Sequence, residues 1–313
     1  MYHETEIGTE IEIGTETDPY IHDAFQVVGI RKTPPTPVRK EKWYQGKPLF
    51  SAVILALIIA GCMGCGLIMT KDPVDLDLHH FSVPPCREFL FGTDPMGRDI
   101  FSMIWYGGRI SLLIGGIAAV ISAGIAFVFG ACSGSAPQWV DALLMRLTEI
   151  LLSIPGILIV MLLQAAFGQA DVFRISMVIG VTSWMSMAKM IRTEVRKIRA
   201  SEFVLAAKCM GGGFFHILWK HLMPNFLPSV LFMMVMNIRS AIAMEAALSF
   251  MGLGLPVEVI SWGSMLSLSE QALTAGSWWM IVIPGAFLTV TLLCITNLAN
   301  DLRKSGTEKC ARF

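Results

Sequence analysis

The chain has 313 residues, of which 54% are hydrophobic and only 15% are charged, and its formal net charge is zero. A soluble domain of this size needs a larger polar share to cover its surface, and a neutral chain is not typical of nucleic-acid binders. The composition therefore argues against both classes and favours a protein whose solvent is lipid.

Residues 1–48 contain no apolar core, so no cleavable signal peptide is expected there. The segment opens with an acidic repeat, "IGTEIEIGTE", and continues with a basic, proline-rich stretch, "RKTPPTPVRKEKW". This composition predicts a disordered, solvated cytoplasmic tail, and a docking or regulatory arm is the alternative.

Six apolar stretches follow this tail. A helix rising 1.5 Å per residue needs about 20 apolar residues to cross a bilayer core about 30 Å thick. The stretches predict an all-α membrane protein with six transmembrane helices, at about 49–69, 109–131, 146–167, 173–191, 226–250 and 278–298. They lie in a transmembrane domain over about 49–305. A short cytoplasmic tail, 306–313, follows it.

Basic residues cluster before the first span, between the fourth and fifth, and after the last. Lysine and arginine mark the cytoplasmic side of a membrane protein. An even number of spans places all three clusters on that side, together with both termini. Five spans would place the C-terminal cluster outside, so the charge pattern supports six.

Two pairs of possible metal ligands lie in the N-terminal half. Cys62 and Cys65 sit inside the first apolar run, where we expect small packing residues rather than a zinc or redox site. His79 and His80 lie in the external segment of about 70–108, beside several aspartates. Imidazole suits nickel, but adjacent histidines on a loop are more often exposed side chains, so no metal site is predicted.

Glu149, Arg239 and Glu245 fall within apolar runs. An ionisable group at membrane depth costs about 2.5–3.5 kcal/mol or more, so it usually faces a cavity or a partner. Arg239 and Glu245 are six residues apart, which does not place them on one helix face. We interpret the three as candidates for the border of a translocation path, and interhelical ion pairs or contacts with another subunit are the alternative.

The cytoplasmic segment of about 201–224 predicts two short helices joined by a glycine turn. Ser201 can cap the first helix, with Glu202 in its first turn, and Gly211 can end it. A second amphipathic piece stops at Pro224, before the fifth span. Physical reasoning leaves two interpretations open, a helix lying on the lipid headgroups and a docking element for a cytoplasmic partner.

The stretch "LAAKCMGGGFFHILWKHLMPN", residues 205–225, resembles the coupling-loop motif of binding-protein-dependent ABC importer permeases. The positions that match are Ala206, Ala207, Gly211 and Pro224. The departures are Leu205 in place of Glu, His221 in place of Ile and Met223 in place of Leu. Glu202, one turn earlier, is the candidate substitute for the missing Glu, and the resemblance implies that this segment contacts an ATPase.

Three further stretches resemble the dipeptide, oligopeptide and nickel branch of that family. They are "FGTDPMGRDIFSMIWYGGRISL" (91–112), "MRLTEILLSIPGIL" (145–158) and "AMEAALSFMGLGLPVEVISWGSML" (243–266). The agreeing positions of the first are Gly92, Thr93, Asp94, Gly97, Arg98, Asp99, Ser102, Gly108, Arg109 and Ser111. The similarity covers about 45–305 and implies the type I ABC importer permease fold, as the second, C-type, permease subunit.

No Gly-x-x-x-x-Gly-Lys-Ser/Thr loop occurs in the chain, so no nucleotide site is expected and the chain is not predicted to be an enzyme. The resemblance implies that ATP and Mg²⁺ are bound by two cytoplasmic ATPase subunits, and that this chain binds no cofactor. It also implies a homologous second permease, an external substrate-binding protein and a location in the bacterial inner membrane.

The expected function is therefore import of di- or oligopeptides, with nickel or a metal chelate as the alternative cargo. A stand-alone secondary transporter is less favoured, because no pair of broken helices carrying carboxylates is visible. A membrane enzyme would need clustered catalytic groups, and the sequence shows none.

Overall fold

The computed structural model describes residues 48–168, 171–199, 223–256, 258–274 and 276–310. Every named element in these ranges is a helix, and an isolated antiparallel bridge joins Thr93 to Asp99. The helices, in chain order, are α1 (Leu49–Met63), α2 (Cys65–Ile68), the 3₁₀ turn η1 (Leu78–His80), α3 (Ile100–Ser135), α4 (Gln138–Ser153), α5 (Gly156–Phe167), α6 (Val172–Thr182), α7 (Met185–Arg199), α10 (Met223–Phe250), α11 (Trp262–Thr274) and α12 (Trp279–Cys310).

Among the described residues, three helices are long and apolar enough to cross a membrane, by length and composition: α3, the Ser229–Phe250 part of α10 and the Trp279–Arg303 part of α12. α4 and α5 pass the same test together, although they are bent by 84° at the break between them. α1 and α6 are shorter apolar helices. The all-α membrane architecture is thus confirmed, while the count of six spans stays a prediction.

Several expected spans are interrupted. The first divides into α1 and α2 at Gly64, and the fourth divides into α6 and α7 at Ser183 and Trp184. The third breaks before Pro155, because proline has no N–H to donate and disfavours the helical conformation of the preceding residue, Ile154. An additional helix, α11, lies in the segment between the fifth and sixth expected spans.

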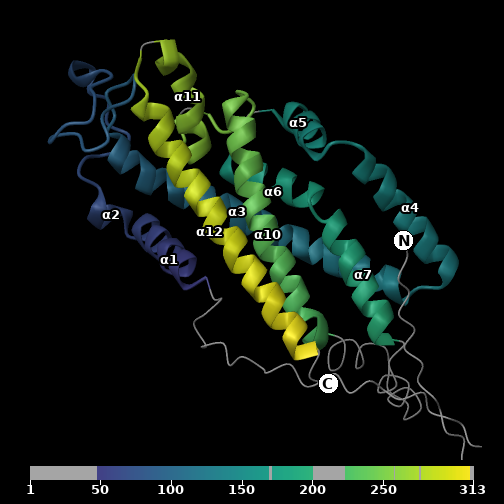
Figure 1. The fold of residues 1–313 in the computed structure, drawn as a ribbon. Coiled ribbons are helices and arrows are strands. Elements are labelled where there is room, and N and C mark those ends of the chain that lie inside the picture. The colour runs from purple at the N-terminus through teal and green to yellow at the C-terminus, as the bar shows by residue number, and fades with distance from the viewer. Residues whose placement is uncertain (1–47, 169–170, 200–222, 257, 275, 311–313) are drawn as a thin grey trace, which may run out of the picture. The chain divides into compact units, whose positions relative to one another are not determined.

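α3 is the helix around which α6, α7 and α10 pack. Small residues allow the close approach. A Cβ built on Gly115 would lie 2.8 Å from the Ile242 side chain of α10, and one on Gly130 would lie 2.7 Å from the Ala188 carbonyl oxygen of α7. Glycines at such positions let helix backbones come together in an apolar setting. Figure 1 shows α10 and α12 side by side, and α1 also contacts α12.

Candidate functional site

The stretch around residues 92–99, singled out in the sequence, folds into a compact turn in front of α3. Asp94 and Arg98 are buried, with 3% and 4% of their surface exposed. Asp94 Oδ1 accepts hydrogen bonds from the backbone N–H groups of Met96 and Arg98, both at 2.8 Å. Arg98 Nε donates to Asp94 Oδ2 at 2.7 Å, and Nη2 lies 2.7 Å from the same oxygen without hydrogen-bond alignment. The pair therefore locks the turn.

Asp99 joins this turn to α3. Its Oδ2 accepts from the backbone N–H and the hydroxyl of Ser102, at 3.1 and 2.7 Å, so Asp99 caps the helix. The same oxygen accepts from the Thr70 hydroxyl at 2.9 Å. Gly97 has a φ of +77°, and a Cβ there would collide with the carbonyl oxygen of Asp77. The turn thus requires glycine at this position for both backbone conformation and space.

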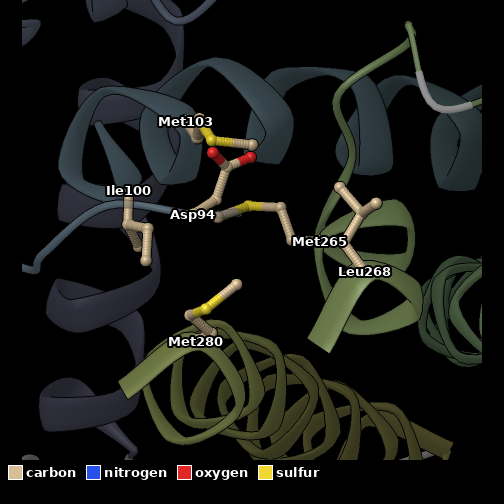
Figure 2. Close-up of a pocket in the computed structure, with 6 residues that line it drawn as sticks. All are labelled: Asp94, Ile100, Met103, Met265, Leu268 and Met280. Atoms are coloured by element: carbon tan, nitrogen blue, oxygen red, sulfur yellow. The ribbon is translucent and has the colours of Figure 1, made fainter. Parts of the chain in front are cut away.

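Asp94 also borders a small cavity between the start of α3, α11 and α12. Figure 2 shows the side chains of Asp94, Met103, Met265 and Met280 around it. Its volume is about 10 Å³, close to the space that one water molecule needs. The cavity is too small to hold cargo. We therefore interpret the residues of this turn as structural rather than as a binding site.

Glu245 of α10 is fully buried, and three serines donate to it. Its Oε1 accepts from Ser261 at 2.7 Å and from Ser249 at 3.0 Å, and its Oε2 accepts from Ser111 of α3 at 3.3 Å. The Ser111 hydroxyl in turn accepts from the backbone N–H of Trp262, at the start of α11, at 3.2 Å. One carboxylate therefore holds α3, α10 and α11 together. The stretches 91–112 and 243–266, recognised separately in the sequence, meet here.

The structure does not bring the three candidates for the translocation path together. None of the ion pairs between described residues joins Glu245 to Arg239. Arg239 is half-buried, and its Nε is buried without a hydrogen bond to the described residues. Glu149 has a half-exposed side chain, pairs with Arg146 at 3.0 Å and lies 4.0 Å from Lys189 of α7. Their proposed roles stay predictions.

Asp141 is a polar centre that sequence reasoning missed. This residue of α4 is 3% exposed, and its two carboxylate oxygens accept from Nε and Nη2 of Arg192, both at 2.5 Å. Arg196 Nη2 lies 3.0 Å away, and Ser133 of α3 donates at 2.6 Å. The cluster fixes α7 against α3 and α4. Arg192 lies 51 residues from Asp141 in the sequence, so no local pattern pointed to the pair.

Most of the predicted ATPase-coupling residues lie outside the described residues: Glu202, Leu205, Ala206, Ala207, Gly211 and His221. The elements that flank them are described. α7 ends at Arg199, and α10 begins at Met223 with Pro224 as its second residue. Proline is tolerated in a first helical turn, so Pro224 opens the fifth expected span there.

In the segment predicted to lie outside, His80 forms an acid–base pair with Asp77. His80 Nδ1 lies 2.6 Å from Asp77 Oδ2, and Asp77 Oδ1 accepts from the His79 backbone N–H. The hydrogen bond from His80 is the main reason that the pKa of Asp77 is lowered. In the described part of the chain, no group of three or more His, Cys, Asp or Glu is placed to hold a metal ion. Cys62 and Cys65 are both buried.

Comparisons with known proteins agree with this architecture. The chain is 33% identical over 260 residues to the dipeptide transport system permease protein DppC of Bacillus subtilis, covering 83% of this chain and 81% of that protein. The oligopeptide transport system permease protein OppC of the same species is 34% identical, covering 82% and 84%. OppC of Haemophilus influenzae is 35% identical over 273 residues, covering 86% and 87%.

A family model described as the binding-protein-dependent transport system inner membrane component matches residues 126–304. The match begins within α3 and extends into α12, so it includes the Asp141 cluster and Glu245. It covers more than half of the 313 residues. This chain therefore belongs to the family of binding-protein-dependent transport system inner membrane components.

Proposed function

We propose that this chain is a permease subunit of an ATP-driven importer of di- and oligopeptides, which an external binding protein delivers. The observation that carries the proposal is similarity to three permeases named for dipeptide or oligopeptide transport, each over more than four-fifths of both chains. These names favour peptides over nickel or metal chelates as cargo. The chain takes the place of the second, C-type, permease.

The proposed assembly has a homologous second permease, two cytoplasmic ATPase subunits and an external binding protein. ATP and Mg²⁺ are bound by the ATPases, and this chain supplies no catalytic residue. Both termini lie in the cytoplasm, in keeping with the positions of the basic residues. Family membership supports such partners in general, and their number and identity are part of the proposal.

Coupling is proposed to enter through the residues between α7 and α10, where Glu202, Ala206, Ala207 and Gly211 contact an ATPase. α7 is suited to carry the motion, because the Asp141 ion pairs and the close approach at Gly130 join it firmly to α3 and α4. A displacement of the coupling segment then moves packed helices together rather than being absorbed at their contacts.

The charged residues of the spans receive different proposed roles. Glu245 acts as a positioning residue, because its contacts are the serines that hold α3, α10 and α11. Arg239 is the candidate for contact with cargo, since its buried Nε lacks a hydrogen bond to the described residues. Glu149 lies on the exposed side of α4, where it is proposed to face the passage shared with the second permease.

The test is reconstitution of the chain with its second permease, two ATPases and binding protein in proteoliposomes. A radiolabelled tripeptide is expected to accumulate only when ATP and this chain are both present, and Ni²⁺ is not expected to accumulate. Uptake of Ni²⁺ without peptide uptake would assign the alternative cargo. ATP hydrolysis or peptide uptake by the purified chain alone would contradict the proposal.

A further inference from the structure

A second, larger cavity lies between the end of α5 and the loop that follows α10. Its volume is about 620 Å³, within the range of small-ligand sites. Gln164 and Gly168 line it from α5, and Gly252, Leu255 and Glu258 line it from the loop. The positions of the basic residues place this end of the helices on the external side, where a binding protein would release cargo.

Gln164 is the unusual residue of this cavity. It is 4% exposed, and neither its Oε1 nor its Nε2 makes a hydrogen bond to the described residues. Buried side-chain amides are nearly always hydrogen-bonded, because an unmet donor or acceptor loses its water without replacement. A carboxamide donates and accepts at once, so it matches the C=O and N–H of a peptide group.

Two glycines border the cavity where the backbone conformation favours glycine, and a hydrogen bond anchors the loop beside it. Gly168 and Gly252 have positive φ angles of +79° and +75°, and a Cβ on either would meet no atom within 4 Å. The loop is anchored where the Leu255 N–H donates to the Ser249 hydroxyl at 3.4 Å. Ser249 itself donates to Glu245, so the loop is tied to the buried carboxylate.

Glu258 gives the cavity a negative charge. Its side chain is exposed, and it is the charged residue among the described residues that line the cavity. A carboxylate beside an apolar surface and an amide favours a ligand with a cationic end and a polar backbone. A peptide with a free amino terminus has both features.

We propose that this cavity is a binding subsite for the amino-terminal end of an incoming peptide. Glu258 binds the terminal ammonium group, and Gln164 pairs with the first peptide groups of the chain. Leu255 and the glycines leave room for side chains of different size. This inference rests on the proposed function, and it adds to that function a place on this subunit where the cargo is recognised.

The test is photocrosslinking of the complete importer with a tripeptide that carries benzophenone on its second side chain. Crosslinks are expected within 164–168 and 252–258, mapped by mass spectrometry. Acetylation of the peptide's amino group is expected to lower the yield about ten-fold, the effect of losing one charge-assisted hydrogen bond. Glu258→Gln should lower the yield of the free peptide similarly and leave that of the acetylated peptide unchanged.

Gln164→Leu should lower the crosslinking of both peptides, because it removes the pairing with the backbone. Asp75→Asn removes an exposed external charge elsewhere, and Gln138→Leu removes an exposed amide from the start of α4. Both controls should crosslink like the unmodified protein. Peptide uptake is measured on the same vesicles, so a failure of the proposed function appears as an absence of uptake.

Three outcomes would overturn the inference while leaving peptide import intact. One is uptake with crosslinks that map only to other segments. Another is an equal fall in the crosslinking yield of the free and the acetylated peptide in Glu258→Gln, which would indicate that Glu258 has a structural role. The third is a cavity occupied in the complete importer by the second permease or by lipid. It would be seen as crosslinks to either one from a photoreactive label attached to Gln164→Cys, while the benzophenone peptide gives no crosslink to the unmodified protein.

Discussion

At the scale of single residues, loss of the Asp141 cluster is expected to be strongly destabilising. Asp141→Asn leaves Arg192 and Arg196 without their carboxylate, and breaking a buried pair costs about 3–5 kcal/mol. The upper part of that range is not expected, because the arginines are partly exposed. We therefore expect a loss of about 3 kcal/mol, measured as a lower thermal midpoint of the purified complex in detergent. Glu149→Gln, at an exposed pair, is the matched control and should change little.

Glu245 provides a second prediction at this scale. Glu245→Leu leaves the hydroxyls of Ser111, Ser249 and Ser261 without their acceptor inside the protein. Buried unmet donors cost about 1–3 kcal/mol each, so this variant should be strongly destabilised. Ser261→Ala removes one donor and should cost about 1 kcal/mol. Equal thermal midpoints for Glu245→Leu and the unmodified protein would show that the cluster does not hold the three helices.

Asp77 is expected to make the turn at residues 77–80 sensitive to acid. The hydrogen bond from His80 lowers the pKa of Asp77 below its ordinary value of 3.8. A carboxyl whose pKa is lower in the folded state stabilises that state above pH 3.8 and loses this effect as the pH falls through the lowered pKa. Hydrogen exchange at residues 77–80 should therefore increase below pH 3.8 relative to Asp77→Asn at the same pH. A constant ratio between the two proteins would contradict this.

At the scale of elements, the approach of α7 to α3 can be tested with two glycines of one helix. A side chain at Gly130 would meet the Ala188 carbonyl oxygen at 2.7 Å, whereas one at Gly124 would meet nothing within 4 Å. Gly130→Val should separate α7 from α3, cost about 1–3 kcal/mol and reduce the peptide imported per ATP hydrolysed. Gly124→Val is the control for the loss of glycine itself. Equal effects of both variants would argue against a specific contact.

The sequence predicts the apolar helices better than their interruptions. Hydropathy counts apolar residues, so it identified α3, α10 and α12, where the apolar run and the helix coincide. It passed over the bend before Pro155, because the residues on both sides are apolar, although the proline itself was visible. α11 was missed since its serines dilute the apolar signal.

The candidate site shows a similar division. The turn at 92–99 follows from local chemistry, since Asp94, Gly97 and Asp99 act within a few residues of one another. Asp141 and Gln164 could not be predicted, because their significance depends on partners, or on the lack of them, that only the folded chain reveals. Tertiary contacts of this kind leave no periodic trace in a sequence.

At the scale of the whole molecule, the orientation in the membrane is open to a direct test. Cys86 is exposed in the segment predicted to lie outside. A maleimide that cannot cross membranes should label it in intact cells, and Cys86→Ser should reduce labelling to background. In Cys86→Ser, labelling of the remaining cysteines should appear only after the membrane is permeabilised. Persistent labelling of intact cells carrying that variant would contradict the predicted orientation.

The sharp bend between α4 and α5 limits the surroundings that this part of the chain can have in a membrane. Both helices are apolar enough to lie in the bilayer, but the helical backbone hydrogen bonding is interrupted between them, at Ile154 and Pro155. Hydrocarbon tails offer nothing to replace the missing bonds, so the corner needs shelter from protein or from a wet passage. The side chains of Ile150, Ile154 and Leu158 are uncovered in the isolated chain. We therefore expect this corner to lie against another protein chain or a water-filled passage rather than against lipid.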